Sequence, residues 1–250
     1  MRLGALLSFT DGNNPNAIVE QAKQLESEGY SSIWMAHAMG RGFMLSDPFV
    51  TLSAVAAVTR DIEIGTAILQ LPLYNPTDIA LKSWSLQNLS GGRFILGVGA
   101  GSTASDYQVH DVGFDDRFSL FDTKLKRLRE IFHTGKVDEH NLSPWPSVQG
   151  GPPIFFGTWG KNVARAAGEF DGWIASGMHR NPDECAAALV GYRKQNGVRA
   201  IVSTISIGAD VDHFELREKL RAFKEAGFDD AIVMFLPGAP TPAEIRLMID

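Results

Sequence analysis

The sequence is poor in the residues from which several kinds of site are built. It has one cysteine, Cys185, in 250 residues, so no internal disulfide can form and a reducing cytoplasm is favoured. Its six histidines share no metal-ligand spacing, which disfavours a metallohydrolase and predicts no metal site. Neither a GxSxG motif nor a converging pair of carboxylates is present, which disfavours a serine hydrolase and a glycosidase.

Long apolar runs and basic runs are also missing. No stretch approaches the ~20 apolar residues that cross a bilayer, and the opening MRLGALLSF is too short for a secretory leader. The formal net charge is -6, so nucleic acid is an unfavourable partner. No GxGxxG nicotinamide motif follows a strand. We therefore expect a soluble, cytoplasmic protein that acts on a small molecule.

What the chain does contain is an alternation of short apolar runs with helical patterns. The runs that we predict as strands are residues 3–9, 31–37, 62–69, 93–99, 153–157, 172–177, 200–208 and 231–238. Asp47-Pro48, Asn75-Pro76 and Asn181-Pro182 are typical helix starts. Eight such units in 250 residues predict an α/β protein, a (β/α)₈ TIM barrel, as a single domain over residues 1–250.

In a barrel the functional residues lie after the strands. The positions that this rule selects are Ser8, Phe9, Thr10, His37, Thr66, Ala67, Ile68, Gly99, Ala100, Gly101, Ser102, Gly157, Thr158, Trp159, Gly160, Ser176 and Pro237. They are poor in charge and rich in glycine, which suits a site whose chemistry is carried by an organic cofactor.

Two glycine-rich stretches are candidates for binding it. Gly97, Gly99 and Gly101 leave room for something flat to lie against the backbone. The turn 157–160 stands before a helix, whose free N–H groups and dipole favour an anion. An ordinary helix start is the alternative interpretation of that turn.

The segment 135–153 is the longest irregular one, and two interpretations are open for it. It is either a lid at the catalytic face, with Trp145 shielding the ligand, or a surface insertion. The helix before it is expected to bury one face. The residues of this face are Phe118, Phe121, Leu125, Leu128 and Phe132.

Several motifs recur together in an order that identifies a family. IEIGTAILQLPLYNPTDIALKSWSLQNLSGGRFILGVGAGS (62–102) closely resembles the luciferase-like monooxygenase family, which consists of flavin- or deazaflavin-dependent (β/α)₈ oxidoreductases. FFGTWGKNVARAAGEFDGWI (155–174) resembles the phosphate-binding turn and the next strand of that family. The resemblance extends in register from Met1 to Gly177 and is looser afterwards.

The resemblance implies a non-covalent FMN, or alternatively coenzyme F420, across the barrel mouth. It also implies a cis peptide between Ala67 and Ile68 that supports the ring. The implied contacts are Thr66, Ala67, Ile68, Gly99 and Ala100 for the ring, and Gly157, Thr158, Trp159 and Gly160 for the phosphate. The implied activity is oxidation of a small organic substrate with reduced FMN and O₂. A separate flavin reductase would supply the FMN, and a homo-oligomer is left open.

The second strand departs from the family pattern. Many members carry an acidic residue and then a histidine after Trp-x-x, whereas here Trp34 is followed in register by His37 and Ala38. His37 then either acts as the catalytic base from one residue earlier or only packs at the flavin edge. A non-catalytic flavin-binding barrel is a competing interpretation, and Ala38 at the histidine position is the feature that favours it. A barrel for a sugar phosphate is a third reading.

Three other side chains receive simpler interpretations. Cys185 is expected to be structural. Asp106 and Tyr107 either contact the cofactor or substrate, or lie in a solvated loop, which is the interpretation that we favour from the sequence.

Overall fold

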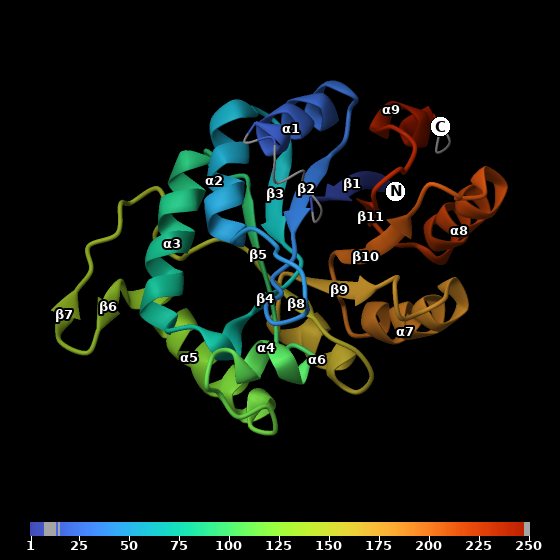
Figure 1. Cartoon of the computed structure of the whole chain (residues 1–250). Helices are drawn as coiled ribbons and strands as arrows, with labels where there is room; N and C mark the ends of the chain where they lie inside the picture. The colour runs from blue at the N-terminus through green and yellow to red at the C-terminus, as the bar shows by residue number, and fades with distance from the viewer. Residues whose placement is uncertain (8–13, 15, 248–250) are drawn as a thin grey trace.

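The computed structural model describes residues 1–7, 14 and 16–247. Eight parallel strands form a closed barrel with helices around it (Figure 1). The barrel strands are β1 (Arg2–Leu6), β2 (Ser32–Met35), β3 (Glu63–Thr66), β5 (Phe94–Gly99), β8 (Ile154–Gly157), β9 (Gly172–Ser176), β10 (Ala200–Ile207) and β11 (Asp230–Phe235). Each pairs with the next, and β11 pairs with β1, which closes the ring. The predicted (β/α)₈ fold is confirmed.

The helices occupy the predicted places between the strands. They are α1 (Ala17–Ser27), α2 (Pro48–Val58), α3 (Pro76–Leu89), the short α4 (Ala104–Gln108), α5 (Arg117–Thr134), α6 (Asn162–Glu169), α7 (Pro182–Lys194), α8 (His213–Ala226) and α9 (Pro242–Leu247). Asp47, Asn75 and Asn181 each accept N–H groups of the helix that follows them, as their position before proline predicts. Ser8, Phe9 and Thr10, expected at the end of the first strand, lie outside the described residues.

Apolar side chains from around the ring fill the inside of the barrel. Trp34 is the largest of them and is fully buried. A Cβ on Gly65 of β3 would meet the Trp34 ring at 2.4 Å, so the glycine makes room for the indole. The other members of this cluster are Leu6, Ala67, Ile95, Phe155, Ile174, Ile201, Ile232 and Met234.

A charge network joins the amino ends of four neighbouring or facing strands. Arg199 lies 2.9 Å from Asp230 and 2.7 Å from Glu63, and Arg2 pairs with the same two carboxylates. Asp230 is fully buried, so the two guanidinium groups compensate a charge that water cannot reach. The amino end of the barrel is therefore a polar structural element.

The predicted buried face of α5 is wrong at its first residue. Phe121, Leu125, Leu128 and Phe132 are buried, and Phe121 stacks on Phe156 at 5.0 Å. Phe118 is instead 52% exposed, and the Arg117 guanidinium lies 4.4 Å from the centre of its ring.

The lid interpretation of residues 135–153 is also wrong. This segment connects the end of α5 to the start of β8, and helix-to-strand connections lie at the amino ends of barrel strands, opposite the catalytic face. It contains a small antiparallel hairpin, β6 (Lys136–Val137) and β7 (His140–Asn141), that projects beyond α3 in Figure 1. Trp145 is 57% exposed on this segment and cannot shield a ligand at the mouth.

Among the described residues, no helix combines the length and the apolar character that crossing a bilayer requires.

Candidate functional site at the barrel mouth

The third strand carries a bulge where it reaches the mouth. Gly65 pairs with Ile95 and Leu69 pairs with Val98, so β3 and the short β4 (Leu69–Gln70) hold one residue more than β5 over this interval. The peptide between Ala67 and Ile68 is cis, as the family resemblance implies. The segment 66–70 thus lies along the mouth end of β5. Ala67 is buried in the barrel interior, and Thr66 donates its hydroxyl to the Gly97 carbonyl at 2.7 Å.

The glycines in β5 and just beyond its end make room for this bulge. A Cβ on Gly97 would meet the Thr66 carbonyl at 1.9 Å, and one on Gly101 would meet the Gln70 side chain at 2.1 Å. Gly99 faces the Ile68 side chain in the same way. The sequence interpretation left this space to a flat ligand, whereas residues 66–70 of the chain itself occupy it.

His37 lies beyond the end of β2, next to the bulge. Its side chain is buried, and its backbone N–H donates to the Ile68 carbonyl at 3.3 Å. The centroid of its ring lies 5.2 Å from that of Tyr74 and 6.2 Å from that of His110. Burial, assisted by the nearby His110, lowers the pKa of His37 to about 4. The imidazole is therefore neutral near pH 7, and its Nε2 has no hydrogen-bond partner among the described residues.

Gln70, which the sequence interpretation missed, links His37 to a buried charge. Its amide nitrogen lies 2.7 Å from Asp106 Oδ2, 3.1 Å from the His37 carbonyl and 3.5 Å from His37 Nδ1. Its Oε1 is buried and also lacks a partner within the described part of the chain. A signal was present: Gln70 is a lone polar residue in the apolar run AILQLPL.

Asp106 is fully buried on α4, so its placement in a solvated loop is corrected. Burial alone would raise its pKa. The Arg41 side chain, the Gln70 amide and the Met39 N–H nevertheless hold the pKa of Asp106 below its usual value. Arg41 Nε lies 2.9 Å from Oδ1, so the carboxylate is ionised and paired.

Tyr107, the neighbour of Asp106, is likewise buried rather than solvated, and burial raises its pKa to about 12. Its hydroxyl donates to the carbonyl of Ala100, which lies just beyond β5. This bond fixes the loop between β5 and α4 and leaves the Ala100 carbonyl satisfied by the chain itself.

The turn 157–160 lies at the end of β8, the strand next to β5. A Cβ on Gly157 would meet Ile68 Cγ2 at 2.4 Å, which brings this turn against the bulge. Thr158 accepts a bond from Trp173 Nε1 at 3.0 Å through its carbonyl, so its hydroxyl is not needed there. Gly160 has a φ of 64°, and no side chain of the described residues caps the helix that follows.

Trp159 is half-buried in the same turn and packs on neighbouring loops. Its ring lies 6.0 Å from that of Trp173, and the Arg180 guanidinium is 4.9 Å above it. Of the remaining predicted positions, Ser102 and Pro237 are exposed and Ser176 is half-buried. None of these three joins the cluster around His37.

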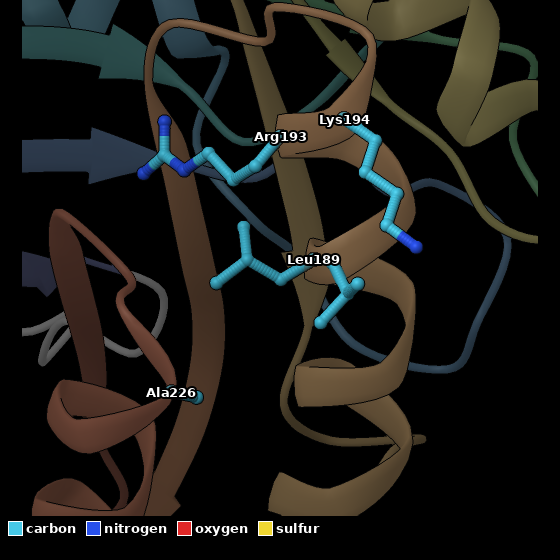
Figure 2. A pocket seen from close by; sticks show the side chains of 5 residues that line it. Leu189, Arg193, Lys194 and Ala226 are labelled. Carbon is cyan, nitrogen blue, oxygen red and sulfur yellow. The ribbon is translucent and has the colours of Figure 1, made fainter.

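The surface has hollows away from this site. Figure 2 shows one between α7 and α8, lined by Leu189, Arg193, Lys194 and Ala226. It lies between helices on the outside of the barrel. Arg193 forms an ion pair there with Asp229 at 2.7 Å, so we interpret this hollow as a gap between two packed helices.

Curated relatives of this chain include enzymes of two kinds. It is 39% identical over 99 residues to a 4-hydroxyprotoasukamycin monooxygenase of Streptomyces nodosus subsp. asukaensis, over 39% of this chain and 26% of that protein. It is 29% identical over 217 residues to an F420-dependent glucose-6-phosphate dehydrogenase of Amycolatopsis mediterranei, over 79% of this chain and 63% of that protein. The chain spans 26 to 55% of the length of the first curated relatives that it matches.

Solved structures share the fold over the whole chain. An F420-dependent secondary alcohol dehydrogenase superposes with a TM-score of 0.79 at 16% identity, over 100% of this chain and 99% of that one. The sequence model of the luciferase-like monooxygenases matches residues 1–231. The chain belongs to the luciferase-like monooxygenase family.

Proposed function

We propose that this protein is a flavin-dependent oxidoreductase that uses reduced FMN and O₂ to oxidise a small organic substrate. The observation that carries the proposal is a pair of buried atoms next to the bulge, His37 Nε2 and Gln70 Oε1, for which the described part of the chain offers no hydrogen-bond partner. Buried polar atoms are almost always hydrogen-bonded, so such a pair is expected where a bound molecule completes the bonding. The isoalloxazine ring system carries both donors and acceptors and fits this demand.

The residues that would hold FMN are those implied by the family resemblance. Thr66, Ala67 and Ile68 present the bulge to the ring, with Gly99 and Ala100 beside it. Gly157, Thr158, Trp159 and Gly160 would hold the phosphate with the uncapped N–H groups of α6. Bound FMN, once reduced, would supply the electrons that react with O₂.

The chain's own contribution is a mouth in which the buried groups next to His37 carry no unpaired charge. His37 is neutral, and Asp106 is buried and paired with Arg41. Such surroundings favour exclusion of water from a reactive reduced cofactor. The neutral imidazole is suited to orient a bound group by a hydrogen bond.

Coenzyme F420 is the alternative cofactor, and hydride transfer without oxygen would then be the reaction. It is supported by the relative and the solved structure that are named as F420-dependent. A non-catalytic flavin-binding barrel is the remaining alternative, supported by Ala38 at the register position of the family histidine.

A binding titration with FMN, anaerobically reduced FMN and F420 separates these functions. We expect both forms of FMN to bind and F420 to bind more weakly. Tighter binding of F420 would replace the proposal with its alternative. Binding of none of the three would overturn both. Oxygen uptake with reduced FMN, measured with and without a panel of small organic substrates, then tests for turnover.

The proposal also includes a single domain over residues 1–250, a cytoplasmic location and a separate flavin reductase. A homo-oligomer is compatible with it. Light scattering of the purified protein tests the oligomeric state, and coupling to a purified flavin reductase tests the supply of reduced FMN.

A further inference from the structure

We infer that Gln70 is a positioning residue that holds His37 in the tautomer with its proton on Nε2. His37 would then donate a neutral hydrogen bond to the molecule in the mouth and would not act as a base. The inference about the donor rests on the proposed function, because it needs a bound molecule. The tautomer itself does not.

The argument starts at Asp106, because an ionised carboxylate only accepts hydrogen bonds. Asp106 Oδ1 is taken by Arg41 Nε at 2.9 Å and by the Met39 N–H at 3.1 Å. The Gln70 atom that lies 2.7 Å from Oδ2 must therefore be the amide nitrogen. The carboxylate thereby fixes which way the Gln70 amide points.

The other hydrogen of that nitrogen points toward His37. The nitrogen lies 3.1 Å from the His37 carbonyl oxygen and 3.5 Å from His37 Nδ1, and both atoms can accept a hydrogen bond. Since an amide nitrogen only donates, a proton on Nδ1 would bring two donors together. The imidazole proton therefore belongs on Nε2.

The Gln70 side chain has little freedom to turn around. It is 2% exposed, and its Oε1 lies 2.1 Å from the place of a Cβ on Gly101. Only glycine at position 101 leaves room for the amide in this orientation. The series of hydrogen bonds from Arg41 through Asp106 to Gln70 thus gives the Gln70 amide a single orientation toward His37.

The consequence concerns the atom at the far side of the ring. His37 is 8% exposed, and its Nε2 has no partner among the described residues. In the inferred tautomer this atom carries a hydrogen, so it offers a donor to an acceptor atom of the bound molecule. To act as a base, His37 in this tautomer would have to accept a proton at Nδ1, which already faces the N–H of the Gln70 amide.

Nitrogen NMR of the full chain with ¹⁵N-labelled histidine tests the tautomer directly, without cofactor. The signals of His37 are assigned by their loss in His37→Gln. We expect the pattern of a neutral ring protonated on Nε2 at neutral pH. A ring protonated on Nδ1, or on both nitrogens, overturns the inference, whether or not flavin binds.

Two variants test whether Gln70 sets that tautomer. In Gln70→Leu and in Asp106→Asn we expect a mixture of tautomers, because the amide is removed in one and released in the other. Gln87→Leu, a change at a half-buried glutamine near the end of α3, is the matched control and should leave the pattern unchanged. An unchanged pattern in a folded Gln70→Leu overturns the positioning role. Should one variant not fold, the other decides.

Cofactor affinity gives a second readout once flavin binding is established. We expect Gln70→Leu to weaken FMN binding ~10-fold, the size of one lost neutral hydrogen bond to the bound ring. An equal loss in Gln87→Leu would contradict a specific effect at His37. A failure of flavin to bind the native chain would refute the proposed function and leave the NMR result standing.

Discussion

Ile68 fills the place that a side chain on Gly99 would need: its Cδ1 lies 2.3 Å from the position of a Cβ at Gly99. A different atom of the same side chain, Cγ2, lies 2.4 Å from the position of a Cβ at Gly157. One isoleucine in the bulge therefore explains a glycine in each of two adjacent strands.

Alanine at either glycine is expected to destabilise the fold by about 1–3 kcal/mol, because overpacking forces neighbouring atoms to move. Adding Ile68→Val removes Cδ1 and keeps Cγ2, so it should relieve part of the Gly99→Ala effect and little of the Gly157→Ala effect. Urea unfolding of the single and double variants measures this. Equal relief at both glycines would contradict the contact assignment.

The turn 157–160 makes a second prediction, which depends on bound FMN. Loss of the Thr158 hydroxyl should remove a charge-assisted hydrogen bond worth about 1.5–3 kcal/mol, so Thr158→Ala should weaken FMN binding by roughly one to two decades. Riboflavin, which lacks the phosphate, should bind poorly and respond little to the change. Equal binding of FMN and riboflavin to the native chain would show that this turn holds no phosphate.

Gly160→Val should weaken FMN binding further. No described atom lies within 4 Å of a Cβ at position 160, so the damage comes from the positive φ of 64°, which valine resists. Gly168→Val is the matched control, because Gly168 lies on α6, the helix that follows Gly160, with open space around its Cβ and without a positive φ. Similar losses of FMN affinity in both variants would point to damage of the helix α6.

Stability should depend on pH through His37. Burial lowers its pKa from 6.5 to about 4, so between these values the unfolded chain binds a proton that the folded chain does not. Stability is therefore full above pH ~6.5 and falls as the pH falls toward ~4, by at most ~3 kcal/mol. His110, Arg41, Asp47 and Asp106 are the charged or titratable groups that act on His37.

The measurement compares native protein with His37→Gln in urea at several pH values. Most carboxylates titrate alike in both proteins, so the difference between the two curves reports His37. The native protein should lose more stability on acidification than the variant. Parallel curves would mean that His37 is not held neutral.

The charge network at the amino end gives a prediction about stability alone. Arg199→Gln should cost about 3–5 kcal/mol, because it takes one of the two cations away from the fully buried Asp230. Arg221→Gln is the control: Arg221 is exposed and its ion pairs, with Glu218 and Glu225, run along its own helix, so its loss should have a far smaller effect on stability. FMN affinity should be unchanged in both variants. Thermal unfolding measures the loss of stability, and an FMN-binding titration of the same variants measures the affinity.

The sequence predicts the barrel well because its signals are local. Apolar β-branched runs and Asp-Pro or Asn-Pro helix starts repeat through the chain, and each fixes its own element. The interpretation of residues 135–153 as a lid is wrong because the length and composition of a loop do not show at which end of the barrel strands it lies. The order of elements contains that information, since residues 135–153 precede β8.

The candidate site was predicted only in part for a related reason. His37 and the turn 157–160 follow strands directly and are visible in one dimension. Gln70 and Arg41 matter through Asp106, which is 36 and 65 residues away from them, respectively. Such partners meet only after the barrel closes. The glycines at the end of β5 are the opposite case. Their pattern is evident in the sequence, but the residues that need the space, Thr66, Ile68 and Gln70, are known only from the structure.

The position of the β6–β7 hairpin has a practical consequence for attaching the protein to a surface. Glu139 in its turn has an 81% exposed side chain, on the side of the barrel away from the mouth. The single native thiol, Cys185, is buried, and burial raises its pKa to about 11. A cysteine introduced at position 139 would thus be the reactive one for maleimide coupling. An electrode or sensor chip coated in this way would hold every molecule with its open end toward the solution.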